Sequence, residues 1–156
     1  MPVVNEPDKQ AIKIVESLFT AESLEDGFDI VADDVVVLDW TMGSEVRGKS
    51  ELMERIHVLD EALHDGNFDI KHMFACDGMV VVDAVYSAVF VSAYKGVAAH
   101  GQKVSWKMRD MFLVENNMVT RMWYASDTLE MAKALGAVDP ALLKERFASD
   151  NNWSGD

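Results

Sequence analysis

The sequence contains one cysteine, Cys76, and therefore cannot form a disulfide within the chain. A single thiol in 156 residues is typical of a reducing compartment, so we expect a cytoplasmic protein. The first ten residues have no apolar stretch of the kind that secretory signals carry. The longest apolar stretch, residues 79–94, is interrupted by Asp83 and falls short of the roughly 20 residues that span a membrane. We therefore expect neither a leader nor a membrane segment.

Basic residues are also scarce. The chain has 14 lysines and arginines against 27 aspartates and glutamates, which gives a formal net charge of −13. A surface this negative repels the phosphates of nucleic acids and the headgroups of anionic membranes. The composition therefore predicts that neither is a partner.

Internal repeats, low-complexity runs and linkers rich in Pro, Gly or Ser are absent. Apolar residues make up 49% of the chain, which is enough for a hydrophobic core at this length. We expect one domain over residues 1–137. A polar tail follows over residues 138–156, in which Asp139 and Pro140 are expected to open a short helix.

The order of the hydrophobic patterns predicts an α+β fold. Possible N-caps precede apolar residues at helical spacing at four places: Asn5 or Asp8, Ser23, Ser50 and Asp127. The third of these helices is expected to end at the turn-forming residues 65–67. Strand patterns cover residues 35–40, 68–74, 79–94, 103–114 and 118–126. We expect helices packed on one face of a curved antiparallel sheet.

Alternation along residues 104–114 singles out one carboxylate. Successive side chains of a strand point to opposite faces, so Trp106, Met108, Asp110 and Phe112 share one face. Asp110 is the only charged residue on that face, and burial there raises the pKa of a carboxyl. A carboxyl kept neutral in this way can donate a hydrogen bond to an oxyanion. It can equally pair with a buried cation or accept bonds from backbone N–H groups.

Asp39 is the second candidate. It lies near the end of the apolar strand pattern of residues 35–40, where a carboxylate suits a general base at the mouth of a pocket. Aspartate at such a position also commonly starts a turn, so the residue alone carries little weight.

Motifs for metal binding or covalent catalysis are weak or missing. His57, Glu61 and His64 fall at helical spacing and could hold a metal, but the apolar residues of that helix turn this face toward solvent. The sequence has neither a G-x-S-x-G motif nor a glycine-rich phosphate loop. We therefore expect no metal and no cofactor.

Two segments resemble a known superfamily. Residues 32–39 (ADDVVVLD), with the glycines and polar residues of 43–48, resemble the opening of ketosteroid isomerases. Residues 110–119 (DMFLVENNMV), with Trp123, Asp127 and the Leu-Gly pair at 135–136, are similar to the closing segment of SnoaL-like polyketide cyclases. Both groups belong to the nuclear-transport-factor-2-like superfamily, and the resemblance covers about residues 8–137. It implies a cone-shaped, strongly curved antiparallel sheet on N-terminal helices (a cystatin-like α+β barrel), an apolar pocket inside, and dimerisation through the outer sheet face.

The resemblance also implies roles for individual residues. The general base of the isomerases falls on Asp39, and their oxyanion-binding carboxylic acid falls on Asp110. Their oxyanion-binding tyrosine falls at or beside Val15, which cannot donate a hydrogen bond. A pocket histidine of the cyclases falls on Asp110, and their catalytic aspartate falls on Tyr124. Neither full set of catalytic residues is therefore present.

The leading hypothesis is a cofactor-independent enzyme that moves a proton next to a carbonyl of an apolar substrate, in an isomerisation or an aldol-type cyclisation. Asp39 is the expected base, Asp110 the donor to the enolate oxygen, and Tyr124 a second donor if its strand turns it inward. The substrate-binding wall is predicted to consist of Trp106, Met108, Phe112, Met122, Val15 and Phe19. The alternative is a non-catalytic module of the same fold that binds an apolar ligand or dimerises.

The opposite face of the strand at 104–114 predicts a partner. It carries a mixture of charged and apolar side chains, namely Ser105, Lys107, Arg109, Met111 and Leu113. Such a mixture suits a contact between the sheets of two copies better than a bare solvent face. We therefore expect a homodimer.

Overall fold

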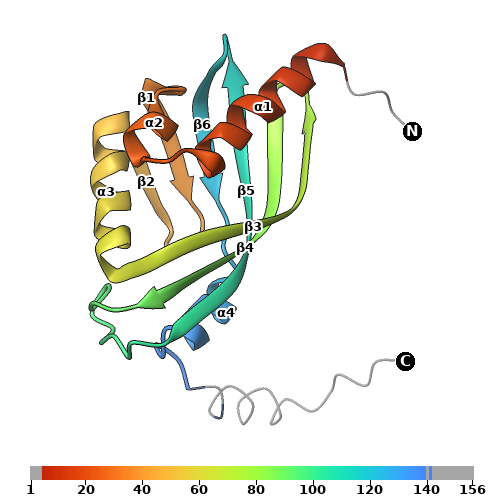
Figure 1. Cartoon of the computed structure of the whole chain (residues 1–156). Coiled ribbons are helices and arrows are strands. Elements are labelled where there is room, and N and C mark those ends of the chain that lie inside the picture. Colours follow the sequence, from red (N-terminus) through yellow and green to blue (C-terminus); the bar gives the residue numbers. More distant parts are fainter. Residues whose placement is uncertain (1–4, 140, 142–156) are drawn as a thin grey trace, which may run out of the picture.

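The computed structural model describes residues 5–139 and 141, and in this part of the chain one curved sheet packs against helices (Figure 1). The helices are α1 (Glu6–Thr20), α2 (Leu24–Phe28), α3 (Lys49–Ala62) and α4 (Thr128–Ala134). The strands are β1 (Val31–Asp39), β2 (Ser44–Arg47), β3 (Leu63–Cys76), β4 (Met79–Phe90), β5 (Lys103–Glu115) and β6 (Met118–Tyr124). Of the short helix expected at Asp139 and Pro140, only Asp139 and Ala141 are described, and the tail that follows lies outside the described residues.

The sheet has the strand order β2-β1-β6-β5-β4-β3. All neighbouring strands are antiparallel except β1 and β6, which run parallel. Figure 1 shows α1 lying across the bent sheet, with α3 beside β1 and β2 and with α4 at the other end of the molecule. The predicted α+β cone is therefore confirmed, although one pairing in the sheet is parallel.

The two central strands divide the side chains between an inner and an outer face. Along β4 and most of β5 every second residue is buried, and the buried residues of β5 include Trp106, Met108, Asp110 and Phe112. This is the face predicted from alternation. The core lies between these side chains and the apolar faces of the helices. Among the described residues, no helix is both long enough and apolar enough to cross a membrane.

The helix caps account for where α1, α2 and α4 begin. The side chain of Asn5 accepts a hydrogen bond from the backbone N–H of Asp8, and Ser23 caps α2 in the same way. Asp127 accepts from the N–H of Glu130 at 2.9 Å, as its position in the sequence predicted. Glu130 does not complete a reciprocal capping box, because its carboxylate accepts from the N–H of Lys107 on β5 at 2.7 Å. This bond fixes α4 to the sheet.

The start and end of α3 differ from the prediction. Its N-cap is Gly48 rather than Ser50, and the φ of +92° there is one that glycine adopts most readily. The helix ends at Ala62, and β3 begins at once. Residues 65–67, expected as a turn, form an irregularity within β3, since the pairing with β4 shifts between His64 and Asn67. Bulges and turns use the same residue types, so composition alone does not separate them.

Strand β2 was not predicted. It has four residues, two of them charged, and it shows no apolar alternation. It forms because the turn after β1 brings it back alongside that strand, where Asp39 pairs with Ser44. A strand this short is specified by its turn rather than by its own pattern.

Candidate active site

A cavity of about 540 Å³ lies between the helices and the inner face of the sheet. Eight of the nine predicted site residues line it: Asp39, Asp110, Tyr124, Phe19, Trp106, Met108, Phe112 and Met122. Val15 is the exception, because it is completely buried in the core and is not among the lining residues. Phe19, one turn further along α1, reaches the cavity instead.

Asp110 is buried, with 6% of its surface exposed. Its Oδ1 atom accepts a hydrogen bond of 2.9 Å from the backbone N–H of Ala125, just after β6. The pKa of Asp110 is raised to about 7, because burial raises it strongly, the bond from Ala125 opposes part of the rise, and the charge of Asp39 adds to it. At neutral pH a large share of the molecules therefore carry a proton on this carboxyl, and Oδ2 is the atom left to hold it.

Asp39 is the last residue of β1 and is half-buried at the cavity wall. Its Oδ1 accepts a hydrogen bond of 2.9 Å from the N–H of Met42 and so shapes the turn that follows β1. The parallel pairing of β1 with β6 places Asp39 opposite Tyr124. The geometry of Asp39 thus agrees both with a role in the turn and with a role as general base. Its Oδ1 holds the turn, while the side chain lies at the cavity wall.

Tyr124 faces the cavity together with Met122. The irregular pairing in β6 falls before Arg121, so Met122 and Tyr124 keep the same side of the strand and Trp123 takes the other. The hydroxyl of Tyr124 donates to the sulfur of Met122 at 3.4 Å. Sulfur is a weak acceptor, so a better acceptor on a ligand can take this donor. Burial, with the charges of Asp110 and Asp39, raises the pKa of Tyr124, which keeps the hydroxyl protonated.

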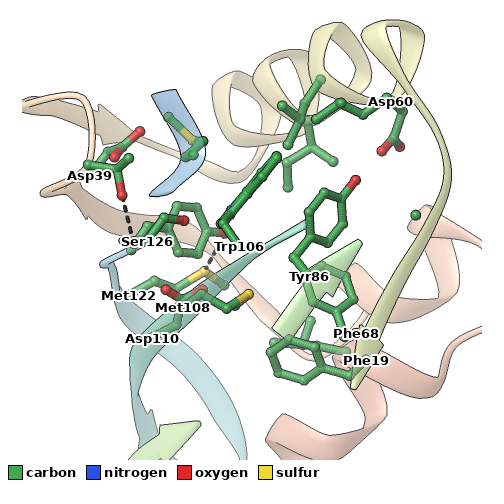
Figure 2. Close-up of a pocket in the computed structure, with 18 of the residues that line it drawn as sticks. Phe19, Asp39, Asp60, Phe68, Tyr86, Trp106, Met108, Asp110, Met122 and Ser126 are labelled. Atoms are coloured by element: carbon green, nitrogen blue, oxygen red, sulfur yellow. Dashed lines mark hydrogen bonds between the residues drawn. The ribbon is translucent and has the colours of Figure 1, made fainter. Parts of the chain in front are cut away.

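Two further polar side chains at this end of the cavity were missed from the sequence. The hydroxyl oxygen of Thr41 accepts a hydrogen bond of 2.8 Å from the N–H of Ser126, and both residues line the cavity. This bond ties the turn after β1 to the segment after β6 (Figure 2). Thr41 follows Asp39 by two residues, and this spacing was the only signal for it. The proton of its hydroxyl stays available to a ligand.

Aromatic rings form a continuous wall on the other side of the cavity. Phe19 contacts Phe112 and Phe68 edge to face, with ring centroids 5.8 and 5.2 Å apart. Tyr86 continues the wall, with its centroid 5.0 Å from Phe68 and 5.0 Å from Trp106. Strand aromatics are common in cores and interfaces, so nothing in the sequence assigned Phe68 to the cavity, and Tyr86 was one of several aromatic residues that could line either a pocket or the core. The wall suits a flat apolar ligand.

The residues considered for a metal do not come together. Because α3 ends at Ala62, His64 lies on β3 and does not share a helix face with His57 and Glu61. Across residues 5–139 and 141, no three His, Cys, Asp or Glu side chains are close enough to hold a metal ion.

The family model for SnoaL-like polyketide cyclases matches residues 9–135 of the chain. Among solved structures, a protein of Jannaschia sp. CCS1 that is proposed to be a SnoaL-like polyketide cyclase has a TM-score of 0.80 at 19% identity, over 89% of this chain and 100% of the other. A proposed polyketide cyclase of Xanthomonas campestris has a TM-score of 0.75 at 19% identity, over 83% and 99%. AclR of Streptomyces galilaeus, a proposed hydroxylase, has a TM-score of 0.70 at 18% identity, over 86% and 98%. No curated protein is significantly similar in sequence.

Proposed function

This chain belongs to the family of SnoaL-like polyketide cyclases, and on that premise we propose that it is an enzyme that moves a proton next to a carbonyl group. The reaction is an isomerisation or an aldol-type cyclisation of an apolar substrate, and it needs no cofactor. One observation carries the proposal. A buried carboxyl with a pKa of about 7, Asp110, and a half-exposed carboxylate, Asp39, line the same largely apolar cavity.

The two carboxyl groups suit opposite roles because their surroundings differ. Asp39 takes a proton from the carbon beside the carbonyl, and the electron pair of that C–H bond moves onto the carbonyl oxygen as an enolate. The protonated Oδ2 of Asp110 donates a hydrogen bond to this oxygen, and Tyr124 is a second donor. Asp39 then returns its proton to a carbon of the enolate. In a cyclisation, the enolate carbon instead attacks a second carbonyl of the same molecule, and the alkoxide oxygen that forms there takes the proton back from Asp39.

An exchange experiment tests this chemistry without knowledge of the natural substrate. 2-Tetralone is a flat bicyclic ketone whose C1 protons are acidified by both the ring and the carbonyl. In D₂O, an enzyme of this type replaces these protons by deuterium faster than buffer does, and NMR follows the loss of the C1 proton signal. Asp39→Asn is expected to reduce the catalysed rate by about 10²- to 10⁴-fold, the usual contribution of a general base.

The design of Asp39→Asn separates chemistry from folding. The amide oxygen of asparagine can still accept the bond from the Met42 N–H, so the turn is kept. Asp34→Asn is the matched control, because Asp34 lies on the same strand, is exposed and does not line the cavity. An exchange rate that is the same in Asp39→Asn and wild type would exclude Asp39 as the base. Binding of 2-tetralone without any catalysed exchange would favour a non-catalytic binding module.

We also propose that two copies associate through the outer face of the sheet. Five apolar side chains lie in register across it, on neighbouring strands: Phe74, Val81, Met111, Trp123 and Leu38. Phe74 is 57% exposed in the single chain. An apolar row of this length on an exposed face is typical of a protein interface.

A further inference from the structure

A second pair of polar groups lines the cavity away from Asp110. Asp60, in the last turn of α3, and Tyr86, on the inner face of β4, both belong to its wall. In Figure 2 they lie on one side of Trp106, whereas Asp39 and Ser126 lie on the other, and the hydroxyl of Tyr86 points toward the carboxylate of Asp60. The cavity therefore has two separate polar ends with an aromatic wall between them.

The Tyr86 hydroxyl and the Asp60 carboxylate face each other without a direct bond. Burial raises the pKa of Tyr86 to about 12, and the charge of Asp60 contributes to the rise. Burial also raises the pKa of Asp60, and the nearby His57 opposes this. No polar side-chain atom of the described residues is both fully buried and unpaired. The Tyr86 hydroxyl is therefore accessible to a ligand in the cavity.

Because Gly66 has no side chain, there is space beside it for the Tyr86 hydroxyl. A Cβ atom at position 66 would lie 2.9 Å from this oxygen and 3.3 Å from the ring carbon Cε2. Gly66 sits in the irregular stretch of β3, where the pairing shifts between His64 and Asn67. The shift and the missing side chain together let the backbone of β3 pass close to the hydroxyl.

The position of Asp60 is unfavourable for the helix that carries it. A carboxylate in the last turn of a helix faces the negative end of the helix dipole, and aspartate is a weak helix former. Glu61 has the same electrostatic position, but it does not line the cavity. The two residues thus form a natural comparison between a carboxylate at the cavity and one outside it.

We propose that Asp60 and Tyr86 form a subsite that binds a hydroxyl group at the end of the substrate away from the reacting carbonyl. A hydroxyl both donates and accepts, so it can donate to Asp60 and accept from Tyr86 at the same time. Asp60 is exposed and lies at the rim of the cavity, and an ether or a second ketone, which only accepts, offers its carboxylate no proton. The subsite rests on the proposed function only in that the same cavity takes up the substrate.

Binding of three related ketones tests this subsite. The dissociation constants of 2-tetralone, 6-hydroxy-2-tetralone and 6-methoxy-2-tetralone are measured by isothermal titration calorimetry. We define the hydroxyl preference as the dissociation constant of 2-tetralone divided by that of its 6-hydroxy form. Removing a hydroxyl from water weakens binding unless the site supplies partners, so a preference above one requires a specific contact. In the wild type we expect about tenfold, which corresponds to about 1.4 kcal/mol. The methoxy compound is expected to bind no better than 2-tetralone.

The variants assign the preference to these two residues. Asp60→Asn and Tyr86→Phe are expected to reduce it toward one, whereas Glu61→Gln is expected to keep it. A wild-type preference of one or less, or a preference that survives in both Asp60→Asn and Tyr86→Phe, overturns the proposal. Because deuterium exchange is a separate readout, a preference without exchange refutes only the catalytic proposal. Exchange without a preference refutes only the subsite.

Discussion

At the scale of the residue, the burial of Asp110 links its protonation to the stability of the protein. The carboxyl has a pKa of about 7 in the folded protein, against 3.8 for an exposed aspartate. Between these two values the folded chain holds a proton that the unfolded chain has lost. The contribution of Asp110 to the free energy of unfolding therefore falls as the pH rises from about 4 to about 7, and it stays constant above that pH.

Asp110→Asn should remove this dependence. The amide oxygen can still accept the bond from Ala125, and the side chain can no longer ionise. The free energy of unfolding of the variant should exceed that of the wild type by an amount that grows with pH, up to on the order of a few kcal/mol. Urea unfolding at pH 4, 6 and 8 measures this, with Asp34→Asn as an exposed control. A constant difference across this range would mean that Asp110 ionises normally.

The same proton predicts the pH profile of catalysis. If Asp110 donates to the enolate, the catalysed exchange of 2-tetralone should fall as the pH rises through about 7, because the donor is lost. Asp110→Asn keeps a donor at every pH, so its profile should lack this fall. The measurement is the exchange rate from pH 5 to 9 after subtraction of the buffer rate. A wild-type rate that increases through pH 7 would instead make Asp110 the base.

The sequence predicted which side chains face the cavity where the alternation of a single strand was enough to place them. Asp110 could be singled out because the period of a strand is fixed and its neighbours are apolar. Asp60, Tyr86 and Thr41 could not, because each meets its partners only when separate elements close around the cavity. Val15 was misplaced for the same reason, since helical spacing identifies the buried face of α1 but not where the core ends and the cavity begins.

At the scale of the element, the junction of α3 and β3 shapes the far end of the cavity. The sequence indicated both elements, but it placed a turn at residues 65–67, where the strand instead contains an irregularity. Helix and strand join directly at Leu63, so Asp60 and Gly66 both come to lie at the cavity wall. Sequence patterns locate long periodic segments better than the boundaries between them.

Gly66→Ala tests whether this junction makes room for Tyr86. Its backbone φ is not in the left-handed region, so alanine is tolerated there, but the new Cβ would meet the hydroxyl at 2.9 Å and displace it. The hydroxyl preference for 6-hydroxy-2-tetralone should fall toward one. Asn67→Ala is the neighbouring control, because Asn67 is exposed and does not line the cavity. An unchanged preference in Gly66→Ala would show that the close approach of β3 does not position Tyr86.

At the scale of the whole molecule, the family and the fold could be predicted because the signals for them are spread along the chain. The resemblance of residues 110–119 to SnoaL-like polyketide cyclases is confirmed by the match of that family model to residues 9–135. The surface is less uniform than the net charge of −13 suggests. On the outer sheet face, β5 and β6 expose several basic side chains, namely Lys103, Lys107, Arg109 and Arg121. Asp83 forms an ion pair with Arg109 there, and its Oδ2 lies 3.1 Å from Nδ1 of His72.

This distribution of charge makes the outer face the place where two copies can approach. Elsewhere two such acidic molecules repel each other, whereas here basic groups offset acidic ones around the apolar row that includes Phe74. Sedimentation velocity at micromolar concentration should therefore show a dimer for the wild type and a monomer for Phe74→Glu. Val58→Glu is the matched control, because Val58 is 56% exposed but lies on α3, away from the sheet, and it should leave the dimer intact. Higher salt should strengthen association by screening the net repulsion. A wild-type monomer, or equal loss of the dimer in both variants, would show that this face is not the interface.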